Sequence, residues 1–283
     1  LKIKDKKIEL ESIKTKIIID SLFNNDFSLK NLDISTRSLE ITNLISFFRN
    51  IENTPELYIL EKIVSKGFLI CEVNLEFDKE GKVKNNYIIN GLIKEAQLKF
   101  LKKYNFDKIN FAFKFQEEIF KLESLKLSLN NTNLLSERIT VKRDIDEKFI
   151  IEGLTQINDL SLKDQFFTES LNNYFPKFNL INLDLESKNK FSFRIDKKFK
   201  INDFKLSSQV KIINLILKND LELGNFLPDI KKEMEINNHL MNINYEKDNI
   251  SISGKGDIFL QKKKDFISYD ILKKKNNLDF KVN

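Results

Sequence analysis

The sequence predicts a mainly β protein, built as a long antiparallel meander with a few short capping helices. Apolar and polar residues alternate with a period of two along most of the chain, as in strands with one apolar and one polar face. Short polar stretches separate these segments, and short connections favour antiparallel neighbours. With 283 residues, 41% of them hydrophobic, the chain is expected to form a single elongated segment, 1–283, of a larger protein.

The clearest strand pair lies in the first third of the chain. Every second residue of Leu69–Phe77 is apolar, and polar residues stand between them. Asp78–Lys82 then reads as a hairpin turn, because Gly81 can adopt a positive φ. A return strand is expected over Val83–Phe100. Similar segments recur to the end of the chain and predict on the order of fourteen strands.

Phenylalanines are concentrated in some of these strands. Ile109–Phe115 carries three of them at alternate positions, and Gln116–Glu118 is expected to turn the chain. In the next segment the phase of the alternation changes at Ser124, after which three leucines share a face over Leu125–Leu129. Burying one phenylalanine side chain contributes about 1.5–3 kcal/mol, so these faces are expected to be dry.

Helical periodicity is found in four places. Asn43–Ile51 has an apolar stripe, and a second helix is expected to begin at Pro55 with Thr54 as its N-cap. A third is expected over Lys163–Tyr174 and a short fourth over Pro228–Glu235. We interpret these helices as caps on the sheet, with contact to a membrane surface as the alternative.

A break in the strand pattern provides the best candidate for a domain boundary. It covers residues 159–176 and contains the third expected helix. It would divide the chain into two strand-rich parts, 1–158 and 177–283.

Groups for catalysis or metal binding are scarce. His239 is the one histidine and Cys71 the one cysteine, so no metal site and no intrachain disulfide are expected. We interpret His239 as a polar residue at the surface or at a sheet edge; an enzyme would require it beside carboxylates in a concave cluster. Glu72 and Glu76 share a face that is expected to meet water. Ser253–Asp257, with two glycines, is expected to be a turn or bulge rather than a phosphate loop. The sequence predicts no catalytic residue and no cofactor.

The charge balance does not favour a nucleic-acid partner. The net charge of +6 comes from 48 Lys and Arg against 42 Asp and Glu, and the lysines are scattered along the chain. A nucleic-acid-binding face is expected to gather arginines and aromatic residues. We therefore expect no nucleic acid among the partners.

The apolar strand faces require a cover, and three covers are open. Too few helices are expected to cover about fourteen strands. In a closed sandwich, a second sheet would fill the same space. In a strongly curved sheet, a ligand with acyl chains would lie against the apolar wall. Periodicity alone leaves the sandwich and the lipid-holding sheet open.

Two segments carry a resemblance to a known family. In the first, over Phe27–Arg49, a strand leads into a short helix through Ile34, Ser35, Thr36, Leu39 and Ile41. In the second, a glycine-containing turn precedes a strand with Asn86, Tyr87, Ile89 and Gly91. Over this first third, the sequence resembles the AsmA-like family of bacterial envelope proteins, in its large YhdP/TamB-type members.

The resemblance implies a function and a location. Such proteins are similar to bridge-like lipid transfer proteins, in which a curved, taco-shaped β-groove shields acyl chains. It implies phospholipid transport between the inner and outer membranes and a part in outer-membrane biogenesis. It further implies a periplasmic segment of a Gram-negative bacterium, held at the inner membrane by an anchor outside this sequence. Phospholipid acyl chains are the expected ligand; protein partners in the envelope stay open.

The expected groove lining combines the phenylalanine-rich strands with aliphatic ones. It consists of Phe111, Phe113, Phe115, Leu125, Leu127, Leu129, Phe191, Phe193, Ile250 and Ile252. No bond would be made or broken in such a groove, so the chain is not expected to be an enzyme. The alternative is a structural or scaffold β-domain that assists outer-membrane assembly without binding lipid.

Overall fold

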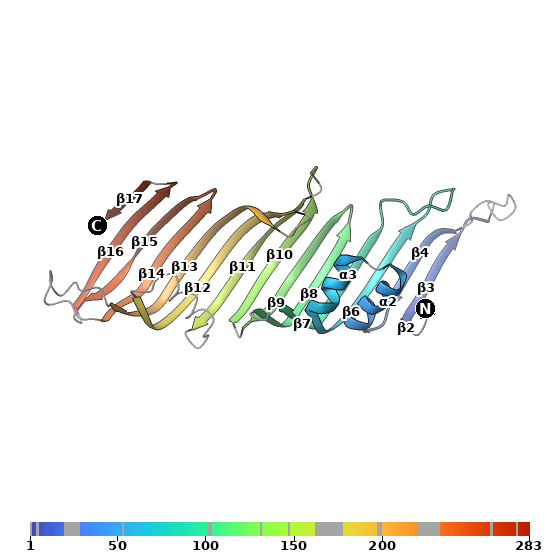
Figure 1. Cartoon of the computed structure of the whole chain (residues 1–283), viewed down its shortest axis with the longest axis horizontal. Helices are drawn as coiled ribbons and strands as arrows, with labels where there is room; N and C mark the ends of the chain where they lie inside the picture. The colour runs from blue at the N-terminus through green and yellow to red at the C-terminus, as the bar shows by residue number, and fades with distance from the viewer. Residues whose placement is uncertain are drawn as a thin grey trace. The chain divides into compact units, whose positions relative to one another are not determined.

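The computed structural model describes residues 2–3, 6–19, 29–52, 54–100, 104–130, 132–146, 148–161, 178–196, 200–219, 233–260, 263–275 and 277–283. These residues are mainly β, as predicted, and the antiparallel meander with short helices is confirmed. Figure 1 shows the strands following one another in chain order.

One open sheet of 15 strands dominates the described residues. Fourteen of them run in hydrogen-bonded sequence from β17 to β3, and β5 pairs with β6 off this path. A separate two-stranded sheet joins β1 (Lys2–Ile3) and β2 (Lys6–Lys7). The strands of the main sheet are β3 (Leu10–Ile17), β4 (Leu29–Thr36), β5 (Leu39–Glu40), β6 (Val64–Glu76), β7 (Ile88–Phe100), β8 (Tyr104–Gln116), β9 (Ile119–Leu129), β10 (Thr132–Arg143), β11 (Phe149–Ser161), β12 (Phe178–Ile195), β13 (Ile201–Asn219), β14 (Glu233–Glu246), β15 (Asn249–Leu260), β16 (Lys263–Lys274) and β17 (Asn277–Val282).

The chain divides into two compact units. Unit 1 comprises Leu1–Leu129 with Glu137–Asp146, and unit 2 comprises Asn130–Ser136 with Glu147–Asn283. The division falls within β10 rather than at the break expected over residues 159–176. Residues 159–161 of that break continue β11, and the rest of it lies outside the described residues.

Two helices lie among the described residues of unit 1, and both were predicted. α2 (Ile41–Ile51) buries Ile45 and Phe47. α3 (Pro55–Ile63) begins with proline, and the Thr54 hydroxyl accepts a bond from the backbone N–H of Leu57 at 3.3 Å. Figure 1 shows both helices on one face of the sheet, across β6 and its neighbours.

Of the two other expected helices, the described residues test only the end of one. The one over Lys163–Tyr174 lies outside the described residues. The one over Pro228–Glu235 was wrong at its end, because residues 233–235 form the start of β14. Met234 and Ile236 alternate there with Glu235 and Asn237, the period of two that is typical of a strand.

Hairpin turns form where the sequence predicted them. Asp78 Oδ1 accepts bonds from the backbone N–H groups of Glu80 and Lys82, each at 2.9 Å, and Gly81 has a φ of 81°. Glu117 and Glu118 both have positive φ, which gives the chain the tight two-residue turn that suits the twist of antiparallel strands.

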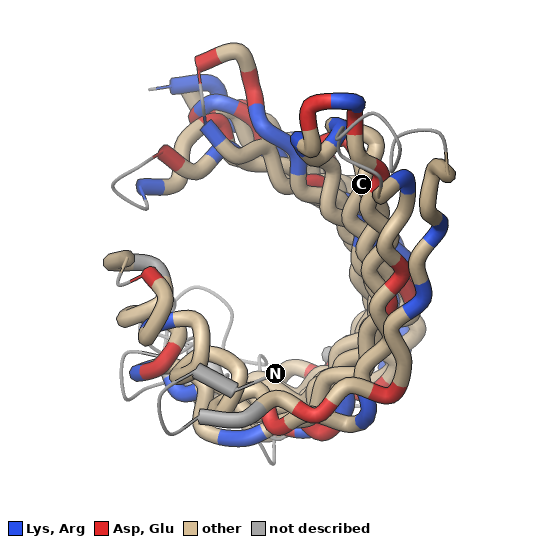
Figure 2. The backbone as a smooth tube through the Cα atoms, turned by 90° about the vertical axis from the view of Figure 1, so that its right-hand side faces the viewer, with Lys and Arg blue, Asp and Glu red and all other residues tan. Residues whose placement is uncertain are grey.

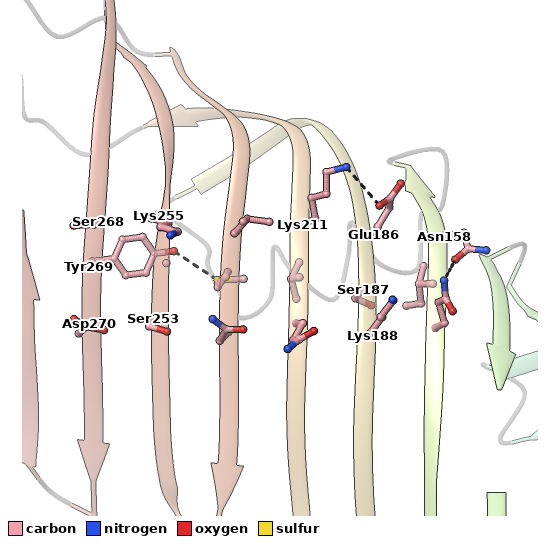
Figure 3. Close-up of a pocket in the computed structure, with 18 residues that line it drawn as sticks. Asn158, Glu186, Ser187, Lys188, Lys211, Ser253, Lys255, Ser268, Tyr269 and Asp270 are labelled. Carbon is pink, nitrogen blue, oxygen red and sulfur yellow. Dashed lines mark hydrogen bonds and ion pairs between the residues drawn. The ribbon is translucent and has the colours of Figure 1, made fainter. Parts of the chain in front are cut away.

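Bulges interrupt the strands in both units. In unit 1 the register shifts where Gly67, Glu95, Lys108 and Ser124 adopt positive φ, on four successive strands. Ser124 is the residue at which the sequence pattern changed phase. A bulge adds a residue to one strand, bends it and moves the following side chains to the other face. Bulges also occur in unit 2, where Figure 3 shows several strands bending near one end.

Charges of both signs are interspersed along the strands. Figure 2 shows Lys and Arg beside Asp and Glu along the backbone, without a large region of one sign. Exposed ion pairs join neighbouring strands, such as Lys205 with Glu246 at 2.6 Å and Lys211 with Glu186 at 3.8 Å. Exposed pairs of this kind contribute little stability, so the apolar faces carry most of the energetics.

Candidate functional site

The apolar face of unit 1 is assembled from cross-strand rows. One row passes from Ile34 on β4 through Val73 and Ile89 to Phe115 on β8 and Phe120 on β9. Because side chains alternate along a strand, the next row on the same face lies two residues away and includes Cys71, Gly91, Phe113 and Leu122. The result is one apolar surface that passes over successive strands of the unit.

Aromatic rings gather on this face. The Phe113 and Phe120 rings are stacked with centroids 5.5 Å apart, and Phe115 lies 5.7 Å from Tyr87 and 6.5 Å from Phe120. The Phe113 ring passes over Gly91, where an added Cβ would come within 2.6 Å of it. Gly91, predicted to lie within a strand, therefore supplies space for an aromatic side chain.

The same face of unit 1 carries its packed core. Ala96, Ile109 and Leu125 are buried together, and Ile41 of α2 packs against them with Phe111 and Leu127. α2 and α3 therefore cover part of the apolar face. They expose apolar side chains of their own, since Phe48, Ile51, Tyr58 and Leu60 are between 45% and 56% exposed.

Unit 2 has an apolar face of the same construction. One row joins Gly153, Phe191, Leu206, Tyr245 and Ile250 across β11 to β15. A second aromatic group lies along it: Phe191 stacks on Phe193 at 5.9 Å, and Phe204 lies 6.4 Å from Phe193 and 5.8 Å from Tyr245.

All ten expected groove-lining residues lie on the apolar face of their own unit. Six are on β8 and β9 in unit 1, and four are on β12 and β15 in unit 2. Leu125 is buried, and the other nine are partly exposed. The structure thus brings each set together on one surface, although it shows no ligand role for them.

Towards the C-terminus this surface becomes more exposed. Phe280 on β17 is 73% exposed and Leu278 is 61% exposed. No helix lies among the described residues of unit 2, and the other sheet in the described part of the chain is the β1–β2 pair. The closed sandwich therefore has no second sheet of matching size within those residues.

A polar patch interrupts the apolar face of unit 2. It consists of Thr155 on β11, Ser187 and Asn189 on β12, and Ser208 on β13, which occupy adjacent positions of two rows. Asn189 Nδ2 donates to Ser187 Oγ at 3.0 Å, and Ser208 Oγ donates to Asn189 Oδ1. Sequence reasoning missed this patch. The sequence does carry a signal for the patch. Between Leu185 and Phe191, polar residues occupy the alternate positions at which apolar residues are expected.

His239 is buried in the interior of β14, so its assignment to a surface or sheet edge was wrong. The side chain is 1% exposed. The register with β15 shifts between Asn237 and Leu240, and Asn238 has a φ of 46°. This bulge places His239 on the apolar face, although Asn237 two residues earlier bonds to Asn214 on the polar face.

The two glycines of Ser253–Asp257 give His239 its space. They stand within the uninterrupted strand β15, so the expected turn is wrong, while the bulge lies opposite them on β14. A Cβ on Gly256 would come within 2.5 Å of His239 Cα, and one on Gly254 within 2.4 Å of the Tyr269 ring.

His239 and Tyr269 form a stacked, hydrogen-bonded pair. Their rings lie 5.4 Å apart, and His239 Nε2 is 3.1 Å from the Tyr269 hydroxyl, which donates to Met241 Sδ at 3.6 Å. Figure 3 shows the Tyr269 side chain reaching from β16 over β15. His239 Nδ1 has no hydrogen-bond partner. Burial lowers the pKa of His239 and raises the pKa of Tyr269, so both side chains are held neutral.

The pH dependence of stability follows from this burial. Above the ordinary histidine pKa of 6.5, His239 is neutral in the folded and unfolded chain. As the pH falls below that value, the unfolded chain takes up a proton that the folded chain resists, so stability is lost with a slope of up to about 1.4 kcal/mol per pH unit. We expect urea unfolding at pH 5.5 to have a lower midpoint than at pH 7.5.

A His239→Gln variant provides the control for this expectation. His239 is the one histidine in the chain, so the variant removes the imidazole titration completely. The loss of stability between pH 7.5 and 5.5 should shrink in the variant. An equal loss in both proteins would assign the effect to carboxylates instead.

A hollow of about 660 Å³ crosses β11 to β16. Most of its lining residues alternate with those of the apolar face and belong to the polar face, including Lys211 and Glu186, whose charged groups are 3.8 Å apart (Figure 3). Its lining also includes Ile157, Val210 and Met241 of the apolar face, but lysines, carboxylates and amides stand among them. The aromatic rows of the open apolar faces carry no such charges, and these faces, rather than this hollow, are the candidate lipid site.

Other site chemistries gain no support from the described residues. No three His, Cys, Asp or Glu side chains in this part of the chain gather closely enough to hold a metal ion. Among the same residues, no helix has the length and hydropathy needed to cross a membrane. The Cys71 thiol lies 3.7 Å from Thr36 Oγ1, and burial raises its pKa, which opposes the reactive thiolate.

Comparisons with known proteins add no assignment. No family model, curated protein or solved structure matches the chain. The likeness to the AsmA-like family therefore stays a prediction from the sequence.

Proposed function

We propose that this chain is a segment of a lipid-conducting protein, in which the apolar sheet faces shield acyl chains while the lipid headgroups stay in water. The observation that carries the proposal is the apolar face of each unit, which runs from strand to strand and stays partly exposed. Exposed apolar surface of this extent is unusual in a soluble protein without an interaction to cover it.

The dimensions of unit 2 suit an acyl chain. Its seven strands from β11 to β17, at about 4.8 Å each, make a surface about 29 Å wide. One leaflet contributes half of a hydrocarbon core of about 30 Å, so a single acyl chain of about 15 Å lies across three or four strands. Contacts spread over many side chains hold such a chain weakly at each point, as movement along the surface requires.

The resemblance to the AsmA-like family supports the wider setting. Under this proposal the segment lies in the periplasm of a Gram-negative bacterium and belongs to a protein anchored at the inner membrane. It supports phospholipid transport towards the outer membrane without catalysing a reaction.

Co-purified phospholipid tests the proposal directly. The chain is purified without detergent, extracted with organic solvent, and the extract is analysed by mass spectrometry. We expect phospholipid at about one molecule or more per chain. Each exposed phenylalanine contributes about 1.5–3 kcal/mol when it is covered, and one acyl chain would cover several such side chains at once. A protein that stays monomeric and folded yet carries no lipid would contradict the proposal and favour the scaffold alternative.

A further inference from the structure

We propose that the polar patch of Thr155, Ser187, Asn189 and Ser208 binds the uncharged ester region of a glycerolipid whose acyl chains lie on the adjoining apolar rows. This inference rests on the proposed function and names the part of the lipid that the face of unit 2 recognises. The patch spans three neighbouring strands, β11 to β13.

The position of the patch matches the structure of an ester-linked lipid. On one side along the strands lies the aromatic row with Phe191 and Leu206, and on the other side lie Leu185 and Ile212. A glycerolipid has the same order of chemistry, since polar ester groups connect to long hydrocarbon chains. The patch therefore offers hydrogen bonds between the apolar residues that lie on either side of it along the strands.

The patch contains hydroxyl and amide groups and no charge. Lys188 and Lys190, the neighbours of Asn189 in sequence, alternate with it and are exposed on the polar face. A carboxylate or phosphate on the apolar face would therefore lose its hydration without gaining a cation from the patch, which costs several kcal/mol. An ester carbonyl needs only a donor.

Donors remain available after the internal bonds of the patch are counted. Asn189 Nδ2 carries two N–H groups, and one of them is used by Ser187 at 3.0 Å. Ser187 and Ser208 are buried at 7% and 4% exposure, whereas Asn189 and Thr155 are partly exposed. The two serines thus orient the amide, and Asn189 with Thr155 meets the ligand.

Two probes that differ only in the ester groups test the inference. The first is radiolabelled dioleoylglycerol; the second is the dialkyl ether of glycerol with the same chains, which lacks both carbonyl groups. We expect the purified chain to bind the diester about fivefold more tightly than the diether, as one additional hydrogen bond gives. Equal affinities in the unmodified protein would overturn the inference without any variant.

Asn189→Leu is the matching variant. It keeps the branched shape of the side chain, with a larger volume, and makes the patch more apolar, so we expect the diester preference to disappear while the diether binds as well as before or better. Asn244→Leu on the same unit is the control, because Asn244 is exposed on the polar face. A preference retained in Asn189→Leu would contradict the inference. Absence of binding by both probes would instead contradict the proposed function.

Discussion

Phe113→Glu is expected to remove the phospholipid held on the apolar face of unit 1, and so to lower the lipid-to-protein ratio of the purified protein. Phe113 stands in the middle of the aromatic group of unit 1, stacked on Phe120 and lying over Gly91. A carboxylate at this position draws water onto the apolar face, and covering it with an acyl chain costs several kcal/mol. That penalty exceeds the gain from covering a phenylalanine, about 1.5–3 kcal/mol, so lipid should leave this part of the surface.

The neighbouring residue supplies the matched control. Lys114 is exposed and points to the opposite face, so Lys114→Glu changes charge more strongly without touching the apolar surface. Phe113→Ala should retain most of the lipid, because affinity is distributed over many side chains. Lipid-to-protein ratios from mass spectrometry distinguish these cases; equal ratios in Phe113→Glu and the unmodified protein would exclude this surface as the lipid site.

Gly256→Ala is expected to lower the free energy of unfolding by about 3 kcal/mol, the upper part of the range for overpacked sites. The added Cβ would meet His239 Cα at 2.5 Å, and that atom belongs to the backbone of a hydrogen-bonded strand. No rotation of a side chain relieves such a clash. The bulge at Asn238 or the pairing of β14 with β15 must therefore give way.

Lys255→Ala tests whether this effect belongs to the glycine position. Lys255 lies between the two glycines on β15 and is exposed on the other face. Its replacement should change stability by less than about 0.5 kcal/mol, as for most surface substitutions. Urea unfolding of the three proteins provides the measurement, and a Gly256→Ala midpoint equal to that of the unmodified chain would refute the close approach.

Most of the fold could be predicted because its signal is local. Alternation over Leu69–Phe77 and Ile109–Phe115 identifies strands without reference to the rest of the chain. The cap at Thr54 and the proline after it mark a helix start in the same way. Even the bulge at Ser124 left a trace, because a change of phase in the alternation is what an added residue produces.

The surroundings of His239 were harder to predict from the sequence, because they depend on how strands pair. His239 has the same parity as Asn237, which predicts the polar face; the bulge at Asn238 reverses that parity and buries the imidazole. Asparagine adopts a positive φ more readily than most residues, but Asn237 beside it has the same property, so the sequence alone does not place the bulge at Asn238. The space beside Gly254 and Gly256 is equally invisible, since only the register with β14 and β16 shows which side chains fill it.

The meander also limits how such a chain can change its length during evolution. Each strand contributes one side chain to each cross-strand row, and successive strands run in opposite directions. Duplication of a whole hairpin therefore widens the surface by two steps and leaves the chain direction and the chemistry of its faces intact. A single inserted residue within a strand does the reverse, because it exchanges the two faces unless a bulge absorbs it. A sheet of this kind can therefore change its width in evolution by gaining or losing strands in pairs.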